Sequence, residues 1–221
     1  MSGNTRHPKP RIESLSDLIF GLALSIGALS LLGNAPRNPG EIGSDLITFG
    51  FSFLILISVW LRYTSVMSVL PIETSAVVVL NVFMLFLVSV EPYLFYLVSR
   101  YEHLIVPNLL EYSSTLFALD LGGLMAILAV FTHLLALEEK NLISRELISR
   151  YKRSRNFLFL TAGLFFLTAF PAFWFWSLQG LPIRFYIWYA ILPITWIRGL
   201  IERPPPANAA LMEGGIVSLG T

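Results

Sequence analysis

Three acidic side chains lie inside or beside long apolar segments, where an ionised group is costly. They are Asp17, Glu91 and Asp120. A charged side chain at the centre of a bilayer costs about 3 kcal/mol on insertion scales, so such residues usually face protein or water. Asp17 fits either a carboxylate favoured by the positive end of a helix dipole or an anchor in a polar network. Glu91 precedes Pro92 and is expected near the outer surface, whereas Asp120 is expected to pair structurally rather than to conduct ions.

The apolar segment that begins near Leu15 carries a second pattern. Apolar residues and one hydroxyl recur three and four positions apart, which places them on one face of a helix. The members of this stripe are Leu18, Leu22, Ser25, Ile26 and Leu29. Small residues such as Gly21 and Gly27 permit close contact between helices. Composition and spacing alone therefore favour ordinary helix packing for this segment.

Other residue types argue against several kinds of chemistry. The three histidines, His7, His103 and His133, are too scattered to predict a metal site, and His133 is interpreted as a hydrogen-bonded polar residue. The chain has no cysteine, which excludes disulfides and thiolate ligands. A net charge of +1 makes nucleic acid a poor candidate partner. No phosphate-binding loop and no catalytic triad spacing is present, so neither an enzyme nor a bound cofactor is expected.

Composition indicates the elements that hold these residues. The chain is 55% hydrophobic and 13% charged, against about 25% charged residues in a soluble domain. A bilayer core needs about 20 apolar residues of helix, and backbone amides in lipid must bond within the segment. The sequence therefore predicts an all-α integral membrane protein formed by a single six-helix repeat. The six transmembrane helices are expected at 15–33, 46–67, 74–98, 113–137, 157–178 and 183–201.

Pro, Gly and charged residues separate these segments. Gln179 to Pro182 predicts a tight turn between the last two helices, and the charged stretch 138–156 predicts a solvated loop. Three regions follow from this division. They are a cytoplasmic N-terminal segment at 1–14, a six-helix transmembrane domain at 15–201 and a flexible cytoplasmic tail at 202–221.

The basic residues predict the orientation. Of the 15 Lys and Arg residues, only Arg37, Arg100 and Arg184 fall on the side opposite the termini. Cytoplasmic loops of membrane proteins carry the excess of Lys and Arg. We therefore expect a multi-pass protein of the cell membrane with both termini in the cytoplasm.

The start of the first helix resembles a known family. Arg11 to Asp17 is similar to the Arg-x-x-x-Phe-Ser-Asp signature of the transmembrane protein 175 family of lysosomal-type potassium channels and their prokaryotic relatives. Trp60 and the stretch 80–86 resemble the family's second and third helices. The chain departs from the pattern at Leu15, where Phe is usual, and just after Trp60, where His is common.

The resemblance implies a potassium-permeable cation channel that assembles as a homotetramer in the lipid bilayer, with the first helix lining the pore. No Thr-Val-Gly-Tyr-Gly filter is present, so side chains would have to select the ion. The resemblance assigns the constriction to Leu22 and the potassium-preferring hydroxyl to Ser25, with Ile26 and Leu29 on further turns. It also implies a structural network of Arg11, Ser16, Asp17 and Trp60. It implies no cofactor and no metal beyond the permeant potassium ions.

Several alternatives stay open. A secondary transporter would need a site at mid-membrane, often with broken helices and inverted repeats. A non-selective or proton-permeable channel would use the same first helix without potassium preference. A membrane enzyme would need clustered polar residues at one depth. An assembly protein would need no permeation path.

Overall fold

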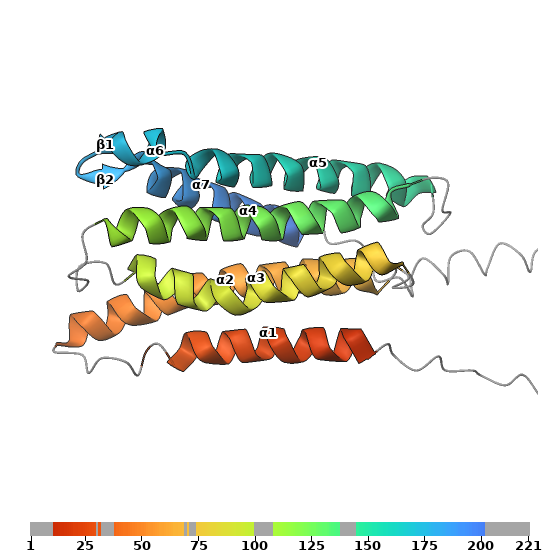
Figure 1. Cartoon of the computed structure of the whole chain (residues 1–221), viewed down its shortest axis with the longest axis horizontal. Helices are drawn as coiled ribbons and strands as arrows, with labels where there is room; N and C mark the ends of the chain where they lie inside the picture. The colour runs from red at the N-terminus through yellow and green to blue at the C-terminus, as the bar shows by residue number, and fades with distance from the viewer. Residues whose placement is uncertain are drawn as a thin grey trace, which may run out of the picture.

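The computed structural model describes residues 11–29, 31, 38–68, 70, 74–99, 108–137 and 145–201, which are mostly helical. Figure 1 shows long helices running along a common axis. Their bounds are α1 Arg11–Leu29, α2 Pro39–Met67, α3 Ser75–Ser99, α4 Leu109–Leu135, α5 Arg145–Thr168, α6 Ala172–Phe175 and α7 Ile183–Ile201. The predicted tail at 202–221 and most of the N-terminal segment lie outside the described residues, as do His7 and His103.

The start of α2 corrects the predicted second segment, which was placed seven residues later. Asn38 caps the helix: its side chain accepts a hydrogen bond from the Glu41 amide at 3.0 Å and donates one to the Glu41 carboxylate at 2.9 Å. Pro39 occupies the first turn, where its missing N–H costs nothing. The prediction took Pro39 and Gly40 as part of the break after the first helix, because neither residue propagates a helix comfortably, whereas proline at the first helical position favours helix initiation.

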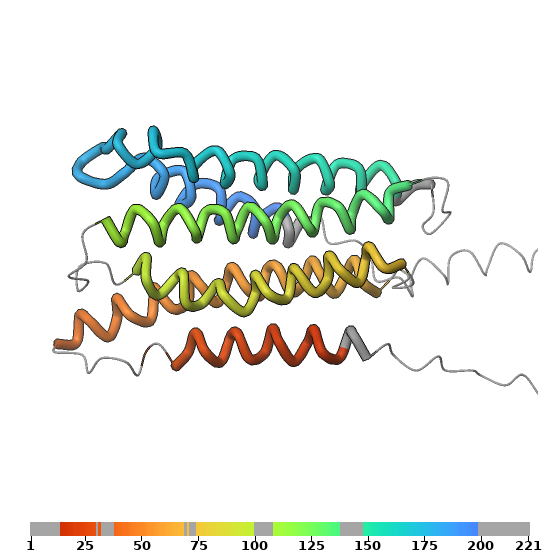
Figure 2. The backbone as a smooth tube through the Cα atoms, viewed as in Figure 1, coloured from red at the N-terminus to blue at the C-terminus, as the bar shows by residue number. Residues whose placement is uncertain are grey.

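The helices pack as a bundle with α1 at its edge (Figures 1 and 2). α1 contacts α2 and α3, α4 lies between α3 and α5, and α7 contacts α2 and α5. The core is apolar and includes fully buried Val59, Met84, Leu121, Leu128 and Phe165. α4 contributes much of this core, whereas the described part of α1 contributes only Phe20 and Ala23 to its buried apolar residues.

The region of the fifth predicted segment differs most from the prediction. α5 begins at Arg145, inside the stretch expected to be a loop, and ends at Thr168 rather than near residue 178. Pro171 and the short α6 follow, then a hairpin of two-residue strands, β1 Ser177–Leu178 and β2 Leu181–Pro182. Gln179 and Gly180 both have positive φ, as a two-residue hairpin turn requires. The predicted tight turn is thus confirmed, and the helical extension before it is wrong.

Length and composition support a membrane protein. Three helices are long and apolar enough to span a bilayer, namely α2, α3 and α4, and the apolar stretch Ser14–Leu29 of α1 is shorter. α5 carries its basic residues in its first half, which leaves 156–168 as its apolar part. A mostly helical membrane protein is therefore confirmed, while the count of six spans stays a prediction.

Candidate functional site

The stripe predicted on the first helix is the exposed face of α1. Leu18, Leu22 and Leu29 are 68%, 57% and 60% exposed, and Ile26 is exposed as well. Phe20 and Ala23 on the opposite face are almost completely buried against the bundle. α1 therefore has one face bound to its own chain and one apolar face without cover from the described residues.

Ser25 places the one hydroxyl on this face. Its Oγ donates a hydrogen bond of 2.8 Å to the carbonyl of Gly21, one turn earlier. Because the hydroxyl proton is used within the helix, the exposed side of Ser25 presents oxygen lone pairs. A cation that has lost water needs oxygen lone pairs in its place, so the stripe combines an apolar surface with one oxygen that can contact a cation.

Leu24 lies on a different face of the same helix. It is partly buried and packs against the core. Leu24 and Leu22 are chemically identical and two residues apart, so their different surroundings follow from the helix period alone.

Hydrogen bonds fix the N-terminal half of α1 to α2. The indole N–H of Trp60 donates to the Asp17 carboxylate at 3.1 Å. The Tyr63 hydroxyl donates to Ser16 Oγ at 2.7 Å, and the amide of Asn81 from α3 lies 3.4 Å from the same oxygen. Ser16, Asp17 and Trp60, three of the four residues expected in a network, are therefore brought together. The side chain of Arg11 lies outside the described residues.

Sequence reasoning missed two members of this anchor, Tyr63 and Asn81. Tyr63 follows Trp60 by one helical turn, so both side chains face α1, and its ring also packs on Phe20 with centroids 5.6 Å apart. Asn81 is a lone amide in an apolar helix and is almost fully buried. A buried amide needs partners, and that requirement was the signal available in the sequence.

The other two acidic residues lie deep inside the bundle. Glu91 is completely buried and Asp120 is 4% exposed, while the position of Glu91 near the outer surface of the membrane stays a prediction. The two belong to α3 and α4, which pack against each other. His133 lies 3.1 Å from Arg155, in agreement with its interpretation as a hydrogen-bonded polar residue.

Comparisons with known proteins agree on one family. Residues 11–92, which span α1, α2 and most of α3, match the family model "Endosomal/lysosomal potassium channel TMEM175". The fold matches the crystal structure of a lysosomal potassium-selective channel TMEM175 homolog from Chamaesiphon minutus, with a TM-score of 0.57 and 16% sequence identity. That match covers 88% of this chain and 97% of the other. No curated protein matches the sequence.

Proposed function

We propose that the chain is a member of the TMEM175 family, whose model matches residues 11–92, and that it forms a potassium-permeable channel whose pore is lined by the exposed face of α1. The observation that carries the proposal is the division of α1 into two faces. One face is hydrogen-bonded and packed on α2 and α3, and the other, from Leu18 to Leu29, is uncovered in the single chain. A symmetric tetramer would turn four such faces toward one axis.

The expected permeation path follows from side-chain chemistry. Four copies of Leu22 around an axis form a narrow apolar neck that an ion can pass only by distorting or losing part of its hydration shell. Potassium loses water at lower cost than sodium, so the neck favours potassium. Four Ser25 oxygens lie about one turn, or roughly 5 Å, along the helix, where they replace part of the lost water. Ile26 and Leu29 prolong the apolar wall, and closing it expels water and shuts the path.

The anchor between α1 and α2 has a supporting role in this proposal. A side-chain filter discriminates between ions only if its radius is held closely, because small displacements change how much hydration is lost. Trp60 and Tyr63 bind two consecutive residues of α1 about one and a half turns before Leu22. The network therefore sets the position and rotation of the lining helix without touching the ion.

A secondary transporter is the competing class, and a flux measurement separates the two. The full chain, purified and reconstituted in liposomes with a potassium gradient, should show rapid passive flux that follows the imposed voltage. Replacing potassium with the large cation N-methyl-D-glucamine should abolish it. Saturable uptake that requires a second, coupled solute would contradict the channel.

The same preparation tests the oligomeric state. Crosslinking or mass measurement of the detergent-solubilised chain should give four copies per particle, since a ring of α1 faces needs them. A monomer that still conducts would remove α1 from the pore, because a single exposed stripe encloses no path.

A further inference from the structure

Glu91 and Asp120 form a buried carboxyl pair that the proposed pore does not use. Glu91 is 0% exposed and Asp120 is 4% exposed. Leu87 of α3 lies against Gly123 of α4, and the two helices run in opposite directions (Figure 1). Glu91 and Asp120 each lie about one helical turn from that contact and on the same side of it, which places them at the same level of the α3–α4 contact. Both point into the bundle, whereas the stripe of α1 faces away from it.

The hydrogen bonds around the pair are few. The Ser52 hydroxyl of α2 lies 3.4 and 3.5 Å from the two Glu91 oxygens, which makes a long and weak donor. Neither oxygen of Asp120 has a hydrogen-bond partner in the described part of the chain. A buried carboxylate without donors carries a large desolvation cost. Asp120 is thus a buried hydrogen-bond acceptor without the donor or cation that an ionised carboxylate requires.

No Lys or Arg side chain in the described part of the chain pairs with Asp120. α1 from Leu18 to Leu29 and the apolar half of α5, residues 156–168, contain no charged residue. The charged groups of the other packed helices are placed elsewhere. Arg62 donates to the Thr195 carbonyl, Arg184 donates to Ser114 and Thr115, Arg198 stacks on Phe157, Glu111 interacts with Arg184, and Glu41 contacts Asn38.

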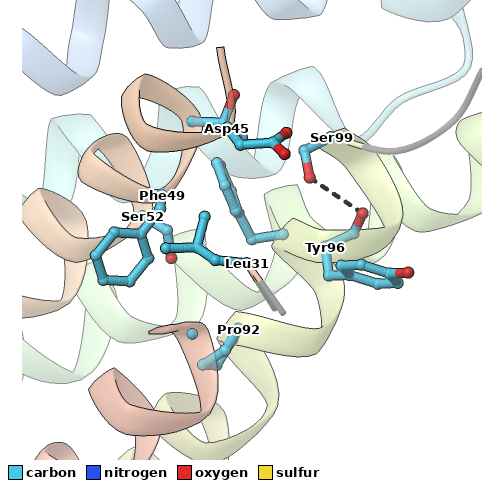
Figure 3. Close-up of a pocket in the computed structure, with 10 residues that line it drawn as sticks. Leu31, Asp45, Phe49, Ser52, Pro92, Tyr96 and Ser99 are labelled. Carbon is cyan, nitrogen blue, oxygen red and sulfur yellow. Dashed lines mark hydrogen bonds between the residues drawn. The ribbon is translucent and has the colours of Figure 1, made fainter. Parts of the chain in front are cut away.

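A small cavity lies beside Ser52, the residue that contacts Glu91 (Figure 3). Its volume is about 20 Å³, which is enough for one water molecule. Its lining includes Asp45 near the start of α2 and Ser99 at the end of α3, and it extends to Ser52, the residue that contacts Glu91. Ser52 therefore lines the cavity and also contacts Glu91, as a proton relay between water and this carboxyl group would require.

We propose that Glu91 and Asp120 share one bound proton at neutral pH and exchange it with water through the cavity beside Ser52. Two ionised carboxylates side by side in a buried site repel each other, and one proton removes that repulsion. The protonated carboxyl then donates its O–H to the carboxylate of its neighbour, which supplies the missing partner. When the proton leaves to water, the site holds two negative charges and the α3–α4 contact weakens. This site is independent of the proposed pore.

Infrared spectroscopy of the full-length protein in lipid tests the proposal directly. At neutral pH the spectrum should contain the C=O stretch of a protonated carboxylic acid, which shifts in heavy water and disappears at high pH. The double variant Glu91→Gln, Asp120→Asn should lose this band, while Glu41→Gln, which removes a carboxylate at the cap of α2, should retain it. Absence of the band from the unaltered protein at neutral pH overturns the proposal, as does its persistence in a folded double variant.

A second arm distinguishes a proton from a metal cation. Potassium or sodium chloride should replace choline chloride at fixed neutral pH, with the unaltered protein. The band should stay unchanged if the pair holds a proton. Loss of the band on adding either metal ion shows that the metal displaces the proton and overturns the assignment. Both arms use the unaltered chain, so the result does not depend on whether the double variant folds.

Discussion

Ser16 shows how one small side chain positions a helix. It is completely buried, accepts a hydrogen bond from Tyr63 of α2 and lies within reach of Asn81 of α3. Three helices therefore meet at a single hydroxyl, next to the Asp17–Trp60 bond. Buried hydrogen bonds of this kind contribute only about 1 kcal/mol each, but an unmade one costs more. Their larger effect is to fix the rotation of α1, and with it the direction in which Leu22 points.

Replacing Tyr63 with Phe tests the anchor. The ring and its contact with Phe20 remain, and only the donor to Ser16 is lost. We expect the free energy of unfolding to fall by about 1 kcal/mol, measured by equilibrium unfolding in mixed micelles. Tyr112→Phe is the matched control because Tyr112 is 67% exposed, and its effect should be near zero. Equal losses in the two variants would contradict a specific role for the Tyr63 hydroxyl.

For single residues, the sequence predicted some members of the hydrogen-bond network but not all of the residues that bind them. Ser16, Asp17 and Trp60 were predicted because they match a family pattern. Tyr63 and Asn81 were missed because they follow Ser16 by 47 and 65 residues, and no local period links them. Hydropathy could not predict that Glu91 is completely buried, because burial depends on how α3 packs against its neighbours.

Two adjacent glycines set how closely α4 packs against its neighbouring helices. A Cβ on Gly122 would lie 2.7 Å from the Phe166 ring of α5, and one on Gly123 would lie 2.8 Å from Leu87 of α3. The adjacent glycines therefore let α4 approach α3 and α5 closely, within one turn of Asp120. Small residues at helix contacts have this role in membrane proteins.

Gly122→Ala should destabilise the α4–α5 contact, because three atoms of the Phe166 ring occupy the space of the new methyl group. Overpacking of this kind costs about 1–3 kcal/mol. Gly163→Ala is the control, since nothing lies within 4 Å of its position in α5, and alanine favours a helix by up to about 1 kcal/mol. In thermal unfolding, Gly122→Ala should lower the melting temperature and Gly163→Ala should raise it slightly. A Gly122→Ala protein as stable as Gly163→Ala would contradict the close approach.

Helix boundaries were the part of the fold least open to prediction. Apolar runs located the centres of α1 to α4, but α2 and α5 extend beyond the apolar limits into polar sequence. Asn38 and Pro39 start α2 through capping, and the basic stretch from Arg145 is helical although it is charged. Hydropathy reports where lipid contact is favourable, and helices continue past that region when caps and neighbours support them.

The whole molecule has two chemically different ends. The end with the start of α1 and the end of α4 also holds the basic start of α5, whereas the hairpin β1–β2 lies at the opposite end (Figure 1). The basic excess predicts that the first end is cytoplasmic. That orientation places the α1 anchor on the cytoplasmic side of Leu22 and the cavity beside Ser52 on the outer side.

Single cysteines test this orientation cleanly, because the chain has none of its own. Ser68→Cys, at the exposed end of α2, should resist a membrane-impermeant thiol reagent in intact cells and react after permeabilisation. Leu178→Cys, in the exposed hairpin, should react without permeabilisation. The reverse labelling pattern would show that the protein has the opposite orientation in the membrane. Labelling of both sites in intact cells would contradict a cytoplasmic position for Ser68.

The proposed permeation path belongs to the proposed tetramer rather than to one chain, and Leu22 is the residue proposed to form its neck. Leu22→Ala should widen the neck and raise conductance while the preference for potassium over sodium falls toward equality. Ser25→Ala should lower the same preference with little change in protein yield, because it removes only a hydroxyl. Leu24→Ala is the matched control: this side chain packs on the core, so its loss should reduce stability and leave selectivity unchanged.

The measurement that tests the pore assignment most directly is the reversal potential of single channels under opposed potassium and sodium gradients, recorded for the unaltered protein and these three variants. The unaltered channel should reverse toward the potassium equilibrium potential. Leu22→Ala and Ser25→Ala should shift the reversal toward zero, while Leu24→Ala should keep the unaltered value. Unchanged reversal potentials for Leu22→Ala and Ser25→Ala, together with a shift for Leu24→Ala, would contradict a pore lined by the exposed face of α1.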